Sequence, residues 1–139
     1  MVYFDDAFAR QSYNSLPDKR IDQSSGQVQL VDNAPADYAL GTLFVYGWGM
    51  AVRAQLFNAS TNDKAALLAA SCYSGAFTSS INSDNVPTGF QLSPPDMDEA
   101  TAAVIKLVPL DQAYGARGST ALDRIQAFTT GYFGGLAAC

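Results

Sequence analysis

The 139-residue chain has a hydrophobic content of 48%, a charged content of 15% and a formal net charge of −5 at pH 7, values typical of one globular domain with its own core. The acidic balance argues against binding to nucleic acid or to an anionic membrane surface, because both need clustered Lys and Arg. Histidine is absent, so the chain has no imidazole for general-base catalysis or for metal coordination.

The first predicted elements are short. Residues 2–4 have the composition of a strand, and Asp5-Asp6 can cap a helix that continues through Tyr13. Polar and turn-forming residues dominate residues 17–36. Within this stretch, residues 27–31 alternate polar and apolar side chains, which indicates a short strand or hairpin arm. A surface loop over the whole of residues 17–36 is the alternative.

Residues 38–57 form the longest apolar run of the chain, and no charged residue lies between Asp37 and Arg53. Apolar side chains recur there at intervals of three and four residues, which predicts a helix that begins near Asp37 and is buried on nearly all sides. The uncharged part is shorter than the ~20 residues that a membrane-spanning helix needs. We therefore expect a core helix and no transmembrane segment.

Two further helices are predicted in the middle of the chain. The first begins at Lys64, after a cap within residues 61–63, and runs to about Ser80. Its many small residues allow a neighbouring helix to approach closely. The second begins at Ser93-Pro94-Pro95-Asp96, because proline is favoured in the first turn of a helix, and it runs to about Val108.

A last helix is predicted from Thr120 to Tyr132, with Ser119 as its cap and Gly134-Gly135 beyond its end. With this helix, the chain is expected to fold as a mainly α domain (α+β with minimal sheet) of four to five packed helices.

Three segments, taken in order, carry a resemblance to a known family. They are Tyr3-Phe4-Asp5-Asp6-Ala7-Phe8 with the apolar helix after it, residues 70–77 (A-S-C-Y-S-G-A-F), and a C-terminal third that contains L-S-P-P-D-M-D-E-A, G-S, D-R-I-Q-A-F and G-Y-F-G-G. This ordered set resembles the neutral zinc metallopeptidase family, a group of zincin-like domains often found in secreted bacterial proteins. The resemblance implies a single zincin-like metallopeptidase domain over residues 1–139, and a segment upstream of Met1.

The zinc-binding helix of that family has the form A-H-E-W-G-H-A-V-Q. Its two His residues share one helix face and bind zinc, and its Glu activates the zinc-bound water. On this pattern, Tyr46 and Met50 stand at the two His positions and Gly47 stands at the Glu position, while Trp48-Gly49 still matches. A single phenol and a thioether do not form a zinc site, so the motif is degenerate in this chain.

The resemblance places a third, acidic zinc ligand on the following helix, where this chain has Leu67 and Ser71, and it places a further His at Arg117. None of these residues replaces the missing ligands. We therefore expect no catalytic residue, no bound metal and no cofactor. Two interpretations of Tyr46 and Met50 stay open: they are packed core residues, or they line a cleft that still recognises a ligand or a peptide.

The resemblance also implies a disulfide between Cys72 and Cys139, the two cysteines of the chain. Such a bond favours a location outside the cytoplasm, either secreted or in the cell envelope. The alternative is a pair of free buried thiols in a cytoplasmic protein. Charged residues near Met1 interrupt any apolar signal segment, so a signal or anchor is expected outside this sequence.

The expected function is that of a catalytically inactive, metallopeptidase-like domain, which serves as a protein-binding or accessory subunit of an exported or envelope-associated complex. Besides residues 17–36 and the degenerate cleft, the candidate partner-binding residues are Trp48, Tyr73, Tyr114 and Arg117.

The alternative function is that of an active hydrolase with a carboxylate-based mechanism that needs no zinc. Asp96, Asp98 and Glu99 supply carboxylates for such a mechanism. Their position at the start of a helix is explained more simply by interaction with the helix dipole and by solvent exposure.

Overall fold

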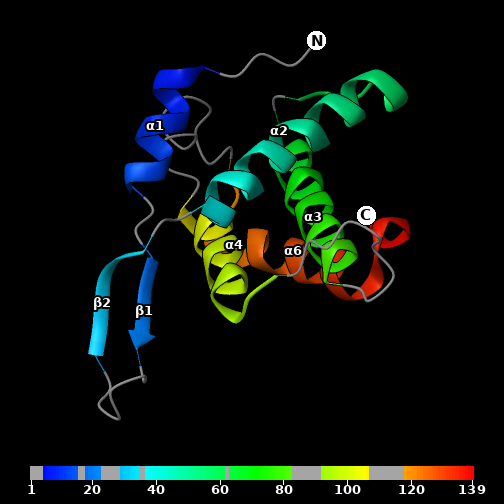
Figure 1. The fold of residues 1–139 in the computed structure, drawn as a ribbon. Helices are drawn as coiled ribbons and strands as arrows, with labels where there is room; N and C mark the ends of the chain where they lie inside the picture. Colours follow the sequence, from blue (N-terminus) through cyan, green and yellow to red (C-terminus); the bar gives the residue numbers. More distant parts are fainter. Residues whose placement is uncertain are drawn as a thin grey trace.

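The computed structural model describes residues 5–15, 18–22, 29–34, 37–61, 63–82, 92–106 and 118–139. Within these ranges the chain is mainly helical, as predicted, with five α-helices, a short 3-10 helix and a two-stranded sheet (Figure 1). The helices are α1 (Asp6–Ser15), α2 (Asp37–Phe57), α3 (Lys64–Ile81), α4 (Pro94–Lys106), α6 (Ala121–Gly134) and the 3-10 helix η1 (Leu136–Ala138).

Strands β1 (Asp18–Asp22) and β2 (Gln29–Ala34) form an antiparallel hairpin in which Arg20 pairs with Val31 and Ile21 pairs with Leu30. The hairpin projects away from the helices (Figure 1). The strand interpretation of this stretch is therefore correct, although β2 begins at Gln29. The strand predicted at residues 2–4 lies outside the described residues.

Side-chain caps fix the starts of the helices. Asp5 Oδ1 accepts a hydrogen bond of 2.8 Å from the backbone N–H of Ala7 at the start of α1. Asp63 Oδ1 accepts one of 2.7 Å from the N–H of Ala66 and caps α3, as predicted. Each cap satisfies an amide that has no partner within its helix.

The predicted cap of the last helix is wrong by one residue. Thr120 caps α6, since its hydroxyl accepts a hydrogen bond from the N–H of Asp123 at 3.1 Å, and the Asp123 carboxylate accepts one from the N–H of Thr120 at 2.8 Å. This reciprocal pair is a capping box. Ser119 is instead buried and bonded to Arg124.

Helices α3 and α6 have the most extensive contact between any two elements of the described chain. Gly75 of α3 and Gly131 of α6 lie where they cross. A Cβ atom on Gly75 would overlap the backbone carbonyl group of Phe128, and one on Gly131 would overlap that of Cys72. Because only glycine lacks a Cβ, these two residues set how closely the two backbones approach.

The buried face of α3 carries several hydroxyl groups. Ser71 donates a hydrogen bond of 3.0 Å to the carbonyl oxygen of Leu67, and Ser74 donates one of 3.0 Å to that of Ala70. Thr78 likewise bonds the carbonyl of Ser74 at 2.8 Å. The helix therefore satisfies its own buried hydroxyls, and they do not require water.

Helix α2 is not buried on nearly all sides, which corrects the prediction. Tyr46 is only 2% exposed, in a core cluster formed by Ala39, Leu43, Tyr46, Leu67, Ala70 and Ala103. Trp48 and Leu56 are 64% and 74% exposed, and Val52 between them is also exposed. Helices α3 and α4, and to a lesser extent α1, contact α2, and none of them covers Trp48, Val52 or Leu56 within the described structure.

Within the described ranges, no helix has both the length and the apolar character that crossing a bilayer would require.

We predict that Gly75→Ala destabilises the protein by about 3 kcal/mol or more, because the new methyl group overlaps a backbone carbonyl group that cannot rotate away. Gly41→Ala is the matched control. Gly41 also lies inside a helix, but a Cβ atom there meets nothing within 4 Å, so this change should stabilise the fold by about 0.5–1 kcal/mol. Urea unfolding measures both values, and equal effects of the two changes would contradict the prediction.

Candidate functional site

The positions that the resemblance assigns to a zinc site lie together where α2 meets α3. The Tyr46 hydroxyl donates a hydrogen bond of 2.8 Å to the carbonyl oxygen of Leu67, and Ser71 Oγ donates one of 3.0 Å to the same oxygen. Met50 packs against the core cluster that contains Tyr46 and Leu67, and Gly47 is half-buried. Packed side chains therefore occupy these positions, which favours the first of the two interpretations of Tyr46 and Met50.

Among the residues that the structure describes, no group of three or more Cys, Asp or Glu side chains could hold a metal ion.

Gly49, next to Trp48, lies at a close contact between α2 and α3. A Cβ atom on Gly49 would lie 2.8 Å from Cδ2 of Tyr73 and 3.2 Å from Cα of Ala70. The glycine therefore lets Tyr73 lie against the backbone of α2. This contact places Tyr73 close to the exposed face of α2.

An apolar groove of about 530 Å³ is bounded by α2, α3 and the residues that follow α6. Its volume is within the usual range for ligand pockets. The side chains that line it are all uncharged, and the larger ones are Val45, Trp48, Val52, Tyr73, Phe77 and Leu136. Trp48 and Tyr73, which the sequence analysis singles out separately, therefore belong to one surface. Tyr114 and Arg117 lie outside the described residues.

Phe77 and Leu136 are groove residues that the sequence alone does not indicate. Phe77 lies on α3 and is 44% exposed. Leu136 follows the last helix, and it is 68% exposed. The apolar spacing of Trp48, Val52 and Leu56, four residues apart on α2, is the one sequence signal that indicates part of this surface.

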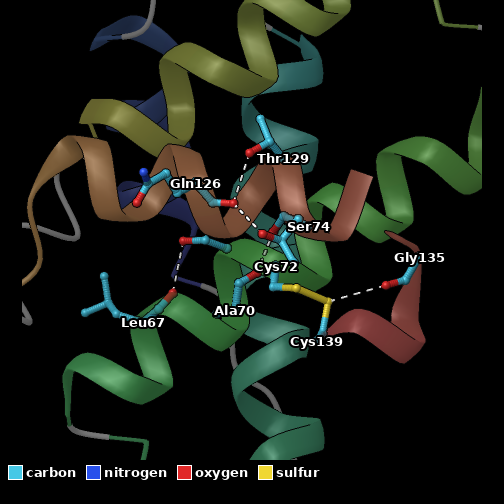
Figure 2. The surroundings of a disulfide bond; sticks show 10 residues. Leu67, Ala70, Cys72, Ser74, Gln126, Thr129, Gly135 and Cys139 are labelled. Carbon is cyan, nitrogen blue, oxygen red and sulfur yellow. Dashed lines mark hydrogen bonds between the residues drawn. A yellow bond between two sulfur atoms is a disulfide. The ribbon is translucent and has the colours of Figure 1, made fainter. Parts of the chain in front are cut away.

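The predicted disulfide between Cys72 and Cys139 is confirmed, with a Cα–Cα distance of 5.6 Å (Figure 2). The alternative of two free thiols is therefore wrong. Cys72 lies within α3 and is only 5% exposed, whereas Cys139 is exposed. The bond connects residues 135–139 to α3, and Gly135 and Leu136 of this segment line the groove.

Glu99 is buried, which corrects its interpretation as a solvated surface residue. It is 3% exposed, and its Oε2 atom accepts hydrogen bonds from the backbone N–H groups of Tyr38 at 2.9 Å and Ala39 at 3.3 Å. A carboxylate from α4 therefore caps the start of α2, where the helix dipole favours negative charge. Ala100 and Ala103 are completely buried, so the helical period could have placed Glu99 on that side.

Tyr38 connects the start of α2 to α3, since its hydroxyl donates a hydrogen bond of 3.0 Å to Thr78 Oγ1. Burial raises the pKa of the Tyr38 phenol above its ordinary value of 10.0. The phenol is therefore neutral at physiological pH and acts as a hydrogen-bond donor.

The other end of α4 is held by Arg124, a buried residue of α6. Its Nε atom donates to the carbonyl of Val104 at 3.0 Å, and Nη2 donates to that of Ile105 at 2.6 Å. Nη1 donates to the backbone oxygen and to Oγ of Ser119, at 3.2 and 3.1 Å. A cation at the last carbonyls of a helix is favourable.

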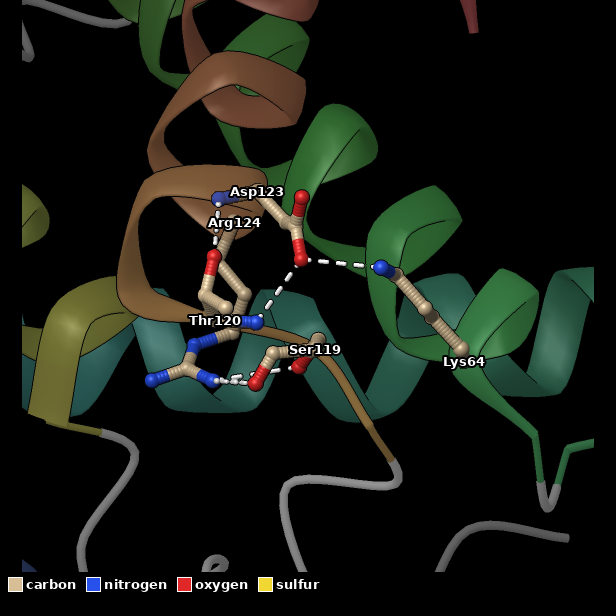
Figure 3. A network of polar contacts seen from close by, with 5 residues as sticks. All are labelled: Lys64, Ser119, Thr120, Asp123 and Arg124. Atoms are coloured by element: carbon tan, nitrogen blue, oxygen red, sulfur yellow. Dashed lines mark hydrogen bonds and ion pairs between the residues drawn. The ribbon is translucent and has the colours of Figure 1, made fainter.

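Asp123 lies beside Arg124 on α6, and its carboxylate forms an ion pair of 2.9 Å with Lys64 of α3 (Figure 3). The hydrogen bond from the backbone N–H of Thr120, followed by the interaction with Lys64, lowers the pKa of Asp123 from 3.8 to about 2. Glu99, Asp123 and Arg124 all belong to segments on which the family resemblance depends. In this structure each of them fixes the packing of helices.

A comparison of the chain with protein-family models, with curated proteins and with solved structures gives no match. The resemblance to the zinc metallopeptidases therefore depends on the segments quoted above.

We predict that Glu99→Gln lowers the free energy of unfolding by about 1–2 kcal/mol, because it removes the negative charge at the start of α2. Asp98→Asn is the matched control, since Asp98 is the exposed neighbour on the same helix, and its effect should stay within about 0.5 kcal/mol. Thermal or urea unfolding measures both. A change at Glu99 no larger than that at Asp98 would show that the cap adds nothing to stability.

The depressed pKa of Asp123 predicts an acid-dependent loss of stability. The contribution of Asp123 is complete above the ordinary pKa of 3.8 and disappears as the pH falls towards 2. Asp123→Asn should therefore be less stable at neutral pH and should lose less stability between pH 4 and pH 2. Lys64→Met should show part of this effect, since it keeps the Thr120 hydrogen bond. Parallel stability–pH curves for the wild type and Asp123→Asn would disprove the assignment.

Proposed function

We propose that the chain is a catalytically inactive, zincin-like metallopeptidase domain that acts as a protein-binding or accessory subunit of an exported or envelope-associated complex. The observation that carries this proposal is the apolar groove, together with the exposed face of α2 that continues it. The partner that fits this surface is the apolar face of a helix, since a helix presents side chains to a groove at matching intervals.

The chemistry of the groove supports an apolar partner. No charged residue lines it, so a charged ligand would lose its hydration without gaining an opposite charge. Trp48 and Tyr73 belong to the residue types that contribute most to binding energy at protein interfaces. Both come from packed helices, so binding would not have to order a flexible loop.

The extent of the exposed surface also supports a protein partner. Trp48, Leu56 and Leu136 are each exposed by about two-thirds or more, and side chains of this size each present roughly 100 Å² to solvent. With Val52 and Phe77, the surface amounts to several hundred Å², the scale at which an exposed apolar patch marks an interaction site.

Both the sequence and the packing support the proposal that the chain does not act as a zinc protease. The chain has no histidine, and Tyr46 is committed to the core through its bond to Leu67. The disulfide supports an extracytoplasmic location, because such bonds persist in oxidising compartments. Within the described chain, Glu99 is the one buried acidic residue, and its Oε2 atom caps α2. Among the described residues, nothing favours the alternative function of a carboxylate-based hydrolase.

We predict that Trp48→Ala reduces recovery of the native partner by about thirtyfold or more, the effect of losing a central aromatic residue worth about 2 kcal/mol. Leu122→Ala is the control. Leu122 is 65% exposed on α6 and does not line the groove, so this change should leave recovery unchanged. Affinity purification from the native host, with quantitative mass spectrometry of both variants and the wild type, measures the effect.

Equal recovery of every associated protein by Trp48→Ala and by the wild type would contradict a role for the groove. One zinc ion per purified chain, or turnover of a generic peptide substrate by that chain, would contradict catalytic inactivity.

A further inference from the structure

Residues 135–139, which follow α6, are held on the domain by few non-covalent contacts. Gly135 ends the helix at φ 68°, and its N–H bonds the carbonyl of Gly131 at 2.8 Å. The N–H of Ala138 bonds Gly135 and that of Cys139 bonds Leu136, at 3.1 and 3.2 Å. These hydrogen bonds are local, and no residue of η1 is buried. The segment therefore gains little of the apolar burial that fixes a chain in place.

The covalent bond between Cys139 and Cys72 is thus the strongest connection between this segment and α3 (Figure 2). The packing of α3 against α6 has a different origin. It depends on the close approach at Gly75 and Gly131, and Phe128 of α6 is buried in the core with Ala100 and Val104 of α4. None of these contacts involves the sulfur atoms of the disulfide.

The same segment is part of the groove. Gly135 and Leu136 line it together with Trp48 and Val52 of α2 and with Tyr73 of α3. A displacement of residues 135–139 removes one side of the groove.

We propose that the Cys72–Cys139 disulfide is a clasp that a dithiol reductant opens, and that its reduction releases residues 135–139 and removes one side of the groove. The inference concerns regulation of the groove, and it rests on the proposed function for its biological meaning. Release of the segment itself can be measured without any partner.

The chemistry begins at Cys139, the exposed member of the pair. A thiolate of the dithiol attacks the Cys139 sulfur and forms a mixed disulfide, while the bond to Cys72 breaks and Cys72 leaves as a thiolate that takes a proton from water. The second thiolate of the reductant then attacks the reductant's sulfur in the mixed disulfide, and Cys139 leaves as a thiolate. Two electrons pass from the dithiol to the protein disulfide, and the reductant becomes an intramolecular disulfide.

The test uses the full chain in native buffer, with and without dithiothreitol, and mass spectrometry after alkylation verifies reduction. We expect hydrogen exchange at the amides of Ala138 and Cys139 to accelerate about tenfold, while the central amides of α3 and α6 stay protected. Binding of the neutral apolar dye Nile red should weaken by about threefold, because the groove loses Leu136.

Two variants separate the steps. Cys139→Ser should show the rapid exchange of the reduced protein without any reductant, and dithiothreitol should not change it further. Leu136→Ala should weaken Nile red binding while the disulfide and the slow exchange of Cys139 stay intact. The measurements on the reduced wild type test the proposal even if Cys139→Ser fails to fold.

Unchanged exchange at Ala138 and Cys139 after verified reduction would overturn the proposal. Loss of protection throughout α3 and α6 would overturn it too, because the bond would then hold the whole domain together. Release of the segment with unaltered dye binding would refute control of the groove. If reduction releases residues 135–139 but Trp48→Ala recovers the partner as well as the wild type does, the clasp is established and only the proposed function is contradicted.

Discussion

The close approach of α3 and α6 is the constraint on which the rest of this fold depends. At Gly75 and Gly131 each helix places its backbone where the other would carry a Cβ atom, so neither position accepts another residue without separation of the helices. The contact aligns Cys72, one turn before Gly75, with the segment that follows α6 and therefore with Cys139.

Charged groups at helix ends position α4 within this frame. Glu99 holds the start of α2, while Arg124 binds the last carbonyls of α4. Both side chains are buried, and removal of one partner from such a contact costs more than the contact contributes, because the remaining group stays unsatisfied. These residues belong to the segments on which the family resemblance depends. Their roles here are architectural, so the presence of those segments does not by itself indicate catalysis.

Features that depend on residues close together in the sequence could be predicted, and features that depend on distant residues could not. Local signals were sufficient for the starts of α1 and α3, since Asp5 and Asp63 cap through amides two or three residues away. The cap of α6 does not follow from the local pattern, because Ser119 and Thr120 both fit it and Ser119 is bonded to Arg124 instead. The Glu99 contact joins residues 61 positions apart, and the exposure of Trp48 depends on which helices lie beside α2. The helical period indicates that Glu99 is buried but not which amides it reaches. The spacing of Trp48, Val52 and Leu56 indicates an apolar stripe but not whether another helix covers it.

The position of the disulfide also determines how the domain would respond to a pulling force. Cys139 is bonded to a residue in the middle of α3, so α4 and α6 lie inside a covalently closed loop. Tension applied at Cys139 passes directly to α3 and cannot unwind α6 from its end, whereas tension at Asp5 acts first on α1, which lies outside the loop. The oxidised domain therefore has a mechanical polarity: load at one end acts on a helix outside the closed loop, and load at the other end is transmitted to the most tightly packed helix.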